Sequence, residues 1–269
     1  MIENKRILCF GGAGSIGSEL VRQLATLNQI YIFDLDETRM YDLVEELGIK
    51  GRVGNIEDYN SVEETFIEFK PDIIFMTAAR KHVTPSEEQP MEAVRTNILG
   101  IDNVIRVCKK YGGQLINIST DKVINQESIM GLTKKIAEKM VRNAGYVSVR
   151  FGNVLGSRGS VIPIWQRQIE SGQPLTVTDA RMMRYMMTIP QACQLLIKAA
   201  EIGKPGQILI MDMGEPVNIL ELAKKILKKA DKEENIKIIG IRPGETLEEQ
   251  LMTPGEKLEA VKRDNFYIL

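Results

Sequence analysis

The sequence has few of the residues from which metal sites and disulfide frameworks are built. It contains one histidine, His82, and three cysteines, Cys9, Cys108 and Cys193, in 269 residues. A single histidine argues against a histidine-based metal site, and three widely separated cysteines form no disulfide framework. Free cysteines are typical of a reducing compartment. We therefore expect a cytoplasmic protein without a bound metal.

A charge excess and long apolar runs are also lacking. Lysine plus arginine number 35 and aspartate plus glutamate 36, which gives a net charge of -1. Such a balance lacks the basic surface on which nucleic acids bind, so we expect no nucleic-acid partner. No run approaches the ~20 apolar residues that span a bilayer, and residues 1–6 precede no signal-peptide core. We therefore expect no membrane insertion.

What the sequence does contain is a regular alternation of short apolar stretches and longer stretches with helical periodicity. The expected strands are Arg6–Phe10, Ile30–Phe33, Gly51–Val53, Ile73–Thr77, Gln114–Ser119 and Val147–Phe151. The expected helices cover residues 15–27, 37–47, 59–69, 91–111 and 132–143. Continuous apolar strands between helices predict an α/β fold, a Rossmann-type doubly wound parallel sheet covered on both faces.

The alternation breaks at about Phe151, where glycine and proline become more frequent. Beyond it we expect short strands at 175–177 and 207–210 and helices at 162–171, 190–202 and 219–230. Residues 1–150 are predicted to form a dinucleotide-binding domain that carries the catalytic residues. Residues 151–269 are predicted to form a smaller, interleaved substrate-binding lobe over the carboxyl edge of the sheet, where ligands bind in such folds.

The glycine-rich stretch Gly11–Gly17 follows the first expected strand and opens the first expected helix. Its GxxGxxG spacing permits a tight turn and brings a pyrophosphate close to the N–H groups at the helix start. Asp34 ends the second strand, where an acidic side chain binds an adenosine ribose and repels a 2′-phosphate. The pattern favours NAD over NADP, although the nearby Arg39 could serve a 2′-phosphate.

A second motif, Ser119-Thr120-Asp121-Lys122, ends the fifth expected strand. At this edge its side chains would face a ligand; the alternative is a solvated turn. Met130 and Lys134 follow at a spacing of four, so they share a helical face. Short-chain dehydrogenases carry Tyr-x-x-x-Lys here, and this chain has the lysine with a methionine in the tyrosine position.

These motifs resemble the nucleotide-sugar 4,6-dehydratases of the polysaccharide-biosynthesis (CapD-like) family, within the extended short-chain dehydrogenase/reductase superfamily. Further matching stretches are Lys81–Val83, Glu92–Asn97, Arg150–Pro163, Asp212–Val217 and Arg242–Glu245. The sequence departs from the family pattern at Asn55, Met76, Thr84 and Gln126.

The resemblance implies an NAD-dependent enzyme that acts on a UDP-sugar and forms a homo-oligomer. It implies catalytic roles for Thr120, Asp121, Lys122 and Lys134, with Lys122 as a base of lowered pKa and Asp121 as an acid of raised pKa. It implies cofactor contacts from Gly11, Gly14, Ser15, Ile16, Gly17, Asp34, Asn55, Ile56, Ala78, Ala79, Arg80, Asn97 and Lys134. It implies substrate contacts from Lys81, Asn153, Ser160, Val161, Ile162, Arg184, Arg242 and Glu245.

Two alternatives stay open. A UDP-sugar 4-epimerase would share both binding sites, although the adjacent Asp121 and Lys122 favour an elimination. A catalytically silent protein that binds NAD or a UDP-sugar is favoured by Met130, which cannot transfer a proton, and opposed by Lys134 and the Asp-Lys pair.

Overall fold

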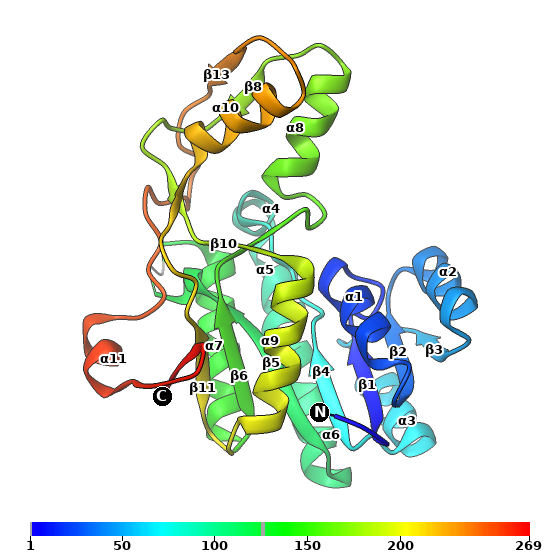
Figure 1. The fold of residues 1–269 in the computed structure, drawn as a ribbon. Coiled ribbons are helices and arrows are strands. Elements are labelled where there is room, and N and C mark those ends of the chain that lie inside the picture. Colours follow the sequence, from blue (N-terminus) through cyan, green and yellow to red (C-terminus); the bar gives the residue numbers. More distant parts are fainter. Residues whose placement is uncertain (1, 125–126) are drawn as a thin grey trace.

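A nine-stranded sheet forms the centre of the molecule, and the computed structural model describes residues 2–124 and 127–269. The strands lie in the order β14-β15-β11-β6-β5-β4-β1-β2-β3 (Figure 1). Their bounds are β1 Arg6–Phe10, β2 Gln29–Asp34, β3 Lys50–Val53, β4 Ile73–Met76, β5 Gln114–Thr120, β6 Val147–Phe151, β11 Ile208–Met211, β14 Val261–Arg263 and β15 Phe266–Ile268. Pairing is parallel from β3 to β11, whereas β15 runs antiparallel to both neighbours. This order confirms the predicted Rossmann-type doubly wound sheet.

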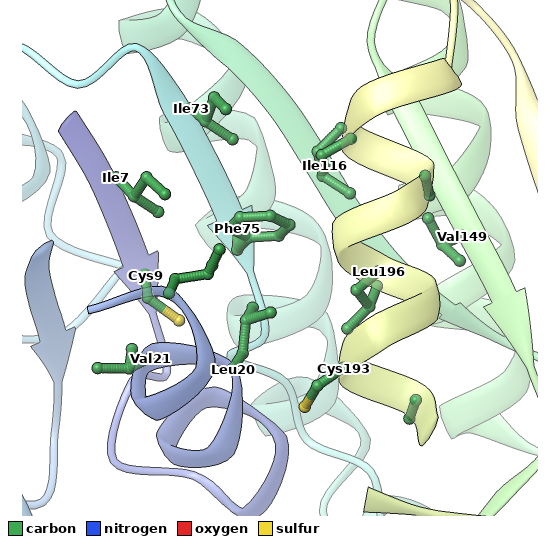
Figure 2. Close-up of a cluster of buried hydrophobic side chains, with 14 of the residues drawn as sticks. Ile7, Cys9, Leu20, Val21, Ile73, Phe75, Ile116, Val149, Cys193 and Leu196 are labelled. Atoms are coloured by element: carbon green, nitrogen blue, oxygen red, sulfur yellow. The ribbon is translucent and has the colours of Figure 1, made fainter. Parts of the chain in front are cut away.

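Helices cover both faces of the sheet because side chains alternate along each strand. The covering helices are α1 Ser15–Leu24, α2 Glu37–Leu47, α3 Tyr59–Phe69, α6 Ile101–Tyr111, α7 Ile129–Asn143 and α9 Ile189–Ile202. Ile7 and Cys9 of β1 belong to one buried cluster with Leu196 of α9 (Figure 2). Leu8 and Phe10 point the other way, into a second cluster with α3, α6 and α7. Each face therefore has its own apolar core.

The helix expected over residues 91–111 is one helical stretch whose winding changes in the middle. It consists of α5 (Pro90–Val94), a π-helical turn (Arg95–Gly100) and α6. Such wide turns are frequent at functional sites. Helix α7 begins earlier than expected, because the Ser128 side chain accepts the backbone N–H of Gly131 and caps it. Gln126 lies outside the described residues.

The second half of the chain adds a small lobe beyond the carboxyl edge of the sheet. The helices and strands of the lobe and of the segments that lead into it are β7 Asn153–Leu155, α8 Val161–Glu170, β8 Leu175–Val177, β9 Met183–Arg184, β10 Met186–Thr188, β12 Val217–Asn218, α10 Ile219–Lys229 and β13 Ile236–Ile238. Helices α8 and α10 lie beside β8 and β13 (Figure 1) around the buried Trp165. Since α9, β11 and β15 belong to the main layer instead, residues 151–269 are interleaved with the sheet. The division at residue 150 stays a prediction.

Sequence patterns missed the shortest elements, among them α4 (Val83–Glu88), α11 (Pro254–Glu259) and the β14–β15 pair. The three cysteines are buried and free. In the described part of the chain, no helix is long and apolar enough to cross a membrane, and no cluster of three or more His, Cys, Asp or Glu side chains could hold a metal.

The α1–α9 core gives a first prediction. Leu20 of α1 is fully buried, so Leu20→Ala should lower the free energy of unfolding by about 2–5 kcal/mol, the usual cost of a leucine-sized cavity. Leu258→Ala on α11 is the matched control, because Leu258 is 90% exposed and surface changes usually stay within about 0.5 kcal/mol. Urea denaturation measures both, and similar losses for the two variants would contradict the packing described.

Candidate functional site

A cavity of about 1020 Å³ lies at the carboxyl ends of the parallel strands. Its walls come from the turn after β1, the end of β2, the segment after β4 and the starts of α7 and α8. Strands β1 and β4 are neighbours in the sheet without being consecutive in the chain. Ligands bind in the crevice that opens at such a switch point. The volume is at the upper end of the range for small-molecule sites.

The turn between β1 and α1 packs so closely that Gly11, and Gly17 in the first turn of α1, have no room for a side chain. Gly11 has a φ of +76°, and a Cβ there would come within 2.5 Å of the backbone nitrogen of Ala78. A Cβ on Gly17 would lie 2.2 Å from the carbonyl oxygen of Gly11. With glycine at these positions, a phosphate group can approach the N–H groups at the start of α1 closely.

Asp34 forms another part of the cavity wall, and its carboxylate is fixed by the backbone. Oδ2 accepts the N–H of Ala13 at 2.9 Å and Oδ1 accepts that of Asp36 at 3.0 Å. Each oxygen keeps a second acceptor position for a ribose hydroxyl. Arg39, which could serve a 2′-phosphate, forms an ion pair with Asp36 at 2.8 Å. The glycine turn and this carboxylate therefore fit a dinucleotide that lacks the 2′-phosphate.

Lys134 and Met130 lie one turn apart on α7, and both line the cavity. The Nζ of Lys134 donates to the carbonyl oxygen of Ile118. Burial lowers the pKa of Lys134 to about 8, although Glu138 acts in the opposite direction. Lys134 thus loses its proton more readily than an ordinary lysine, whereas the thioether of Met130 has no proton to exchange.

Two residues expected at the cofactor lie behind the cavity wall. The buried amide of Asn97, in the π-helical turn, accepts the N–H of Arg80 at 2.9 Å and donates to the carbonyl of Arg80 and to Thr133 Oγ1. Asn97 therefore fixes the segment after β4 against α7. Asn55 likewise does not line the cavity, because its side chain caps its own turn.

Thr120, Asp121 and Lys122 stand together where β5 ends. Asp121 Oδ1 accepts from Lys122 Nζ at 3.2 Å and from Thr120 Oγ1 at 2.9 Å. The buried Oδ2 has no hydrogen-bond partner among residues 2–124 and 127–269. Burial raises the pKa of Asp121 to about 7; Lys122 opposes the rise and Glu249 adds to it. This is the direction expected for a proton donor.

Glu249 was not anticipated from the sequence. Its Oε1 lies 2.7 Å from Lys122 Nζ and 3.1 Å from Arg184 Nε, and Oε2 accepts from Asn153 Nδ2 at 2.8 Å. Burial favours a higher pKa for Glu249, but the two cations lower it to about 2. Burial likewise favours a lower pKa for Lys122, but the carboxyl groups of Asp121 and Glu249 raise it. That direction is opposite to the one expected from the sequence.

The two arginines expected on the nucleotide differ in their surroundings. The Nη groups of Arg184 donate to the carbonyl oxygens of Thr246 and Leu247, so this side chain holds the segment that carries Glu249 in place. Arg242 is exposed and lies 4.0 Å from Glu245, and both line the cavity. Arg242 thus has more freedom than Arg184 to contact a ligand.

Most of the predicted site residues meet at this cavity. They are Gly11, Gly14, Ser15, Ile16, Gly17, Asp34, Ile56, Ala78, Ala79, Arg80, Lys81, Thr120, Lys122, Lys134, Asn153, Ser160, Val161, Ile162, Arg184, Arg242 and Glu245. A smaller cavity of about 130 Å³ adjoins it and is lined by Asp121, Lys122, Asn153, Arg184 and Glu249, among others. The site therefore combines residues from both halves of the chain.

A family model described as "Polysaccharide biosynthesis protein" matches residues 7–269. The chain belongs to this family. The capsular polysaccharide biosynthesis protein CapD of Staphylococcus aureus is 40% identical over 276 residues, which cover 95% of this chain. The match covers 46% of that relative, so the chain spans about half of its length.

Two solved structures are similar to this chain over most of its length. The X-ray structure of Pen from Bacillus thuringiensis is similar with a TM-score of 0.94 and 34% identity, over 99% of this chain and 88% of Pen. The UDP-glucose 4-epimerase of Thermus thermophilus, in complex with NAD, gives a TM-score of 0.81 and 25% identity, over 94% of this chain and 92% of the epimerase. Both likenesses extend over sheet and lobe together.

The burial of Asp121 gives a second prediction. Its pKa rises from 3.8 to about 7 on folding, so between these values the folded state holds a proton that the unfolded state has lost. The stability that this group confers therefore falls as pH rises through that window and stays low above it. We expect Asp121→Asn to gain stability over the wild type progressively from pH 4 to 7 and to level off by pH 8, as measured by urea denaturation.

Asp179→Asn is a control whose stability relative to the wild type should change with pH in the opposite direction. A hydrogen bond from the Arg181 side chain lowers the pKa of Asp179 to about 2. This group therefore stabilises the fold above its unfolded-state pKa, and that contribution is lost as pH falls. Asp179→Asn should therefore lose stability relative to the wild type as pH rises from about 2 to about 4, and should change little at higher pH. If the stability difference between Asp121→Asn and the wild type did not change with pH, the raised pKa of the Asp121 carboxyl group would be contradicted.

Proposed function

We propose that the chain is an NAD-dependent enzyme that converts a UDP-hexosamine, with UDP-N-acetylglucosamine as the first candidate, to a 4-keto-6-deoxy sugar nucleotide. The observation that carries this proposal is the buried Asp121–Lys122 pair beside a cavity that also fits a dinucleotide. Membership of a polysaccharide biosynthesis family and the likeness to an epimerase solved with NAD support a nucleotide-sugar substrate.

The cofactor half of the cavity would hold NAD through the glycine turn and Asp34. These residues would hold NAD, which would supply reversible hydride transfer for the oxidation at C4 and the reduction at C6 of the sugar, so no outside reductant would be consumed. Lys134, with its pKa of about 8, would hydrogen-bond the nicotinamide ribose. Thr120 would hydrogen-bond the 4-hydroxyl of the sugar.

The substrate half would hold the UDP group. Val161 and Ile162 are the first residues of α8. Their backbone N–H groups and the helix dipole would favour a phosphate group there. Lys81 and Arg242 would supply positive charge to the diphosphate, and Glu245 would accept ribose hydroxyls. Asn153 and Ser160 would contact the sugar from β7 and from the start of α8.

Elimination of water across C5 and C6 needs a base for the C5 proton and an acid for the departing 6-hydroxyl. Transfer of one proton from Lys122 Nζ to Asp121 Oδ1, along the 3.2 Å hydrogen bond, turns an ammonium–carboxylate pair into an amine and a carboxylic acid. The amine then removes the C5 proton and the acid protonates the leaving oxygen. Both groups return to their starting charges, so the proton balance closes.

This mechanism predicts that Lys122→Met stops dehydration and leaves ligand binding intact. The change removes the base and keeps most of the side-chain volume, and loss of a general base commonly costs ~10²–10⁴ in rate. The assay is formation of the 4-keto-6-deoxy product from UDP-N-acetylglucosamine, with calorimetry for NAD and UDP. Lys139→Met, at an exposed position of helix α7, is the control. Undiminished product from Lys122→Met would exclude Lys122 as the base.

Cofactor choice gives a further prediction. NAD should bind more tightly than NADP, because the fixed carboxylate of Asp34 would meet a 2′-phosphate with like charge. Asp34→Ala should narrow that difference, whereas Asp42→Ala, at an exposed position of α2, should not. Calorimetry with both cofactors measures the ratio. Equal affinities in the wild-type chain would refute the assignment of Asp34.

A UDP-sugar 4-epimerase is the second candidate, favoured by the likeness to the Thermus thermophilus enzyme. It would return the hydride to C4 and would need neither proton transfer at C5 nor loss of the 6-hydroxyl. Product analysis separates the two, since only the dehydratase forms a keto sugar without the 6-hydroxyl. The cytoplasmic location and the homo-oligomeric state stay predictions.

A further inference from the structure

The segment Ser157–Ser160 joins β7 to α8 and lies against the glycine turn of the first half of the chain. Ser15 Oγ accepts from the backbone N–H of Arg158 at 3.0 Å and from its Nε at 3.3 Å. The Nη2 of Arg158 donates to the carbonyl oxygen of Ala13. A Cβ on Gly14 would lie 3.9 Å from the same Nη2. The guanidinium thus lies beside the start of α1.

The charge of Arg158 lacks a directly paired carboxylate. In the described part of the chain, the hydrogen bonds of its side chain go to a hydroxyl and a carbonyl oxygen. Burial and the charge of Arg39 lower the pKa of Arg158, while Asp34 and Asp36 act more weakly in the opposite direction. Burial and, to a smaller extent, the charge of Arg158 lower the pKa of Lys81, which lines the same cavity. Two cations that face one cavity without paired carboxylates favour an anionic ligand between them.

We propose that Arg158 is a further cofactor-binding residue, whose guanidinium contacts the pyrophosphate of the dinucleotide while Ser157–Ser160 crosses over it. The inference rests on the proposed function, because it assumes that a dinucleotide lies on the glycine turn. A guanidinium can bind two phosphate oxygens at once. With the N–H groups of α1 on one side and Arg158 on the other, the pyrophosphate would be held from both halves of the chain.

The end of the Ser157–Ser160 segment nearest α8 is also closely packed. Gly159 has a φ of +71°, and a Cβ there would come within 2.4 Å of His82 Cε1. Ser160 begins α8, and its buried Oγ has no hydrogen-bond partner among the described residues. A phosphate contact at Arg158 would therefore also fix the start of the helix that lines the substrate half. Cofactor retention of this kind suits a reaction in which the cofactor is regenerated in place.

The test is the NAD affinity of Arg158→Ala, measured by calorimetry on the whole chain. Loss of charge-assisted hydrogen bonds should weaken NAD binding roughly 10- to 100-fold. The NAD affinity of Arg158→Lys should lie between those of Arg158→Ala and the wild type, because lysine keeps the positive charge and lacks the planar guanidinium group. UDP affinity without NAD should stay unchanged in both. Arg181→Ala is the matched control, since Arg181 is an exposed arginine paired with Asp179 outside the cavity lining.

The outcomes separate this inference from the proposed function. If the wild-type chain binds NAD and Arg158→Ala binds it with the same affinity, the role of Arg158 is overturned and the proposed function still stands. A wild-type chain that binds no NAD would overturn both. If Arg158→Ala does not fold, as judged by circular dichroism, Arg158→Gln takes its place, since glutamine keeps hydrogen-bonding capacity without charge. Wild-type affinity in that variant would also overturn the role of Arg158.

Discussion

The carboxylate of Glu249 is bound by three groups from three separate stretches of the chain: Lys122 after β5, Asn153 in β7 and Arg184 in β9. Burial of each of these polar or charged groups without a partner would cost free energy. The two carboxylate oxygens of Glu249 provide a partner for all three. The segment that carries Glu249 is in turn held by hydrogen bonds from Arg184 to its backbone. The position of Lys122 therefore depends on contacts that join both halves of the chain.

This arrangement also sets the protonation of the pair. Glu249 stabilises the ammonium form of Lys122 and disfavours the carboxylate form of Asp121. A buried site with two carboxyl groups and one ammonium ion titrates as a coupled set, so its pKa values belong to the group and not to one residue. Coupled groups with separated pKa values are the usual means by which one site provides both acid and base.

A second buried ion network orients the helix on the other side of the cavity. Arg150 is fully buried and donates through its fork to Glu138 of α7 and Glu256 of α11, and Ser119 donates to Glu138 at 2.6 Å. Breaking such a pair commonly costs about 3–5 kcal/mol, because it leaves an uncompensated buried charge. Glu138 lies one turn beyond Lys134 on α7, so the network fixes the helix rotation that keeps Lys134 at the cavity.

Local patterns in the sequence predicted the elements that bury continuous apolar runs. The strands β1 and β6 and the helix α3 have the expected bounds, because periodicity and turn residues act within a few positions. The two-residue strands β9 and β12 were missed, since their pairing joins residues far apart in the chain. Glu249 had no signal either, because it stands in the stretch Leu247–Gln250 without a motif and meets Lys122, Asn153 and Arg184 only in the folded chain. Asn97 was assigned to the cavity, and its amide is used instead to hold the backbone of Arg80.

One stretch of eleven residues, 150–160, connects these separate contacts. Arg150 reaches into the buried ion network, Asn153 binds Glu249, and Arg158 lies on the glycine turn. The backbone between them is short and its ends are fixed by the sheet and by α8. The three contacts therefore depend on the path of one short backbone segment, which starts in β6 and ends at α8. The buried ion network, the Asp121–Lys122 pair and the glycine turn thus meet along a single segment of the chain.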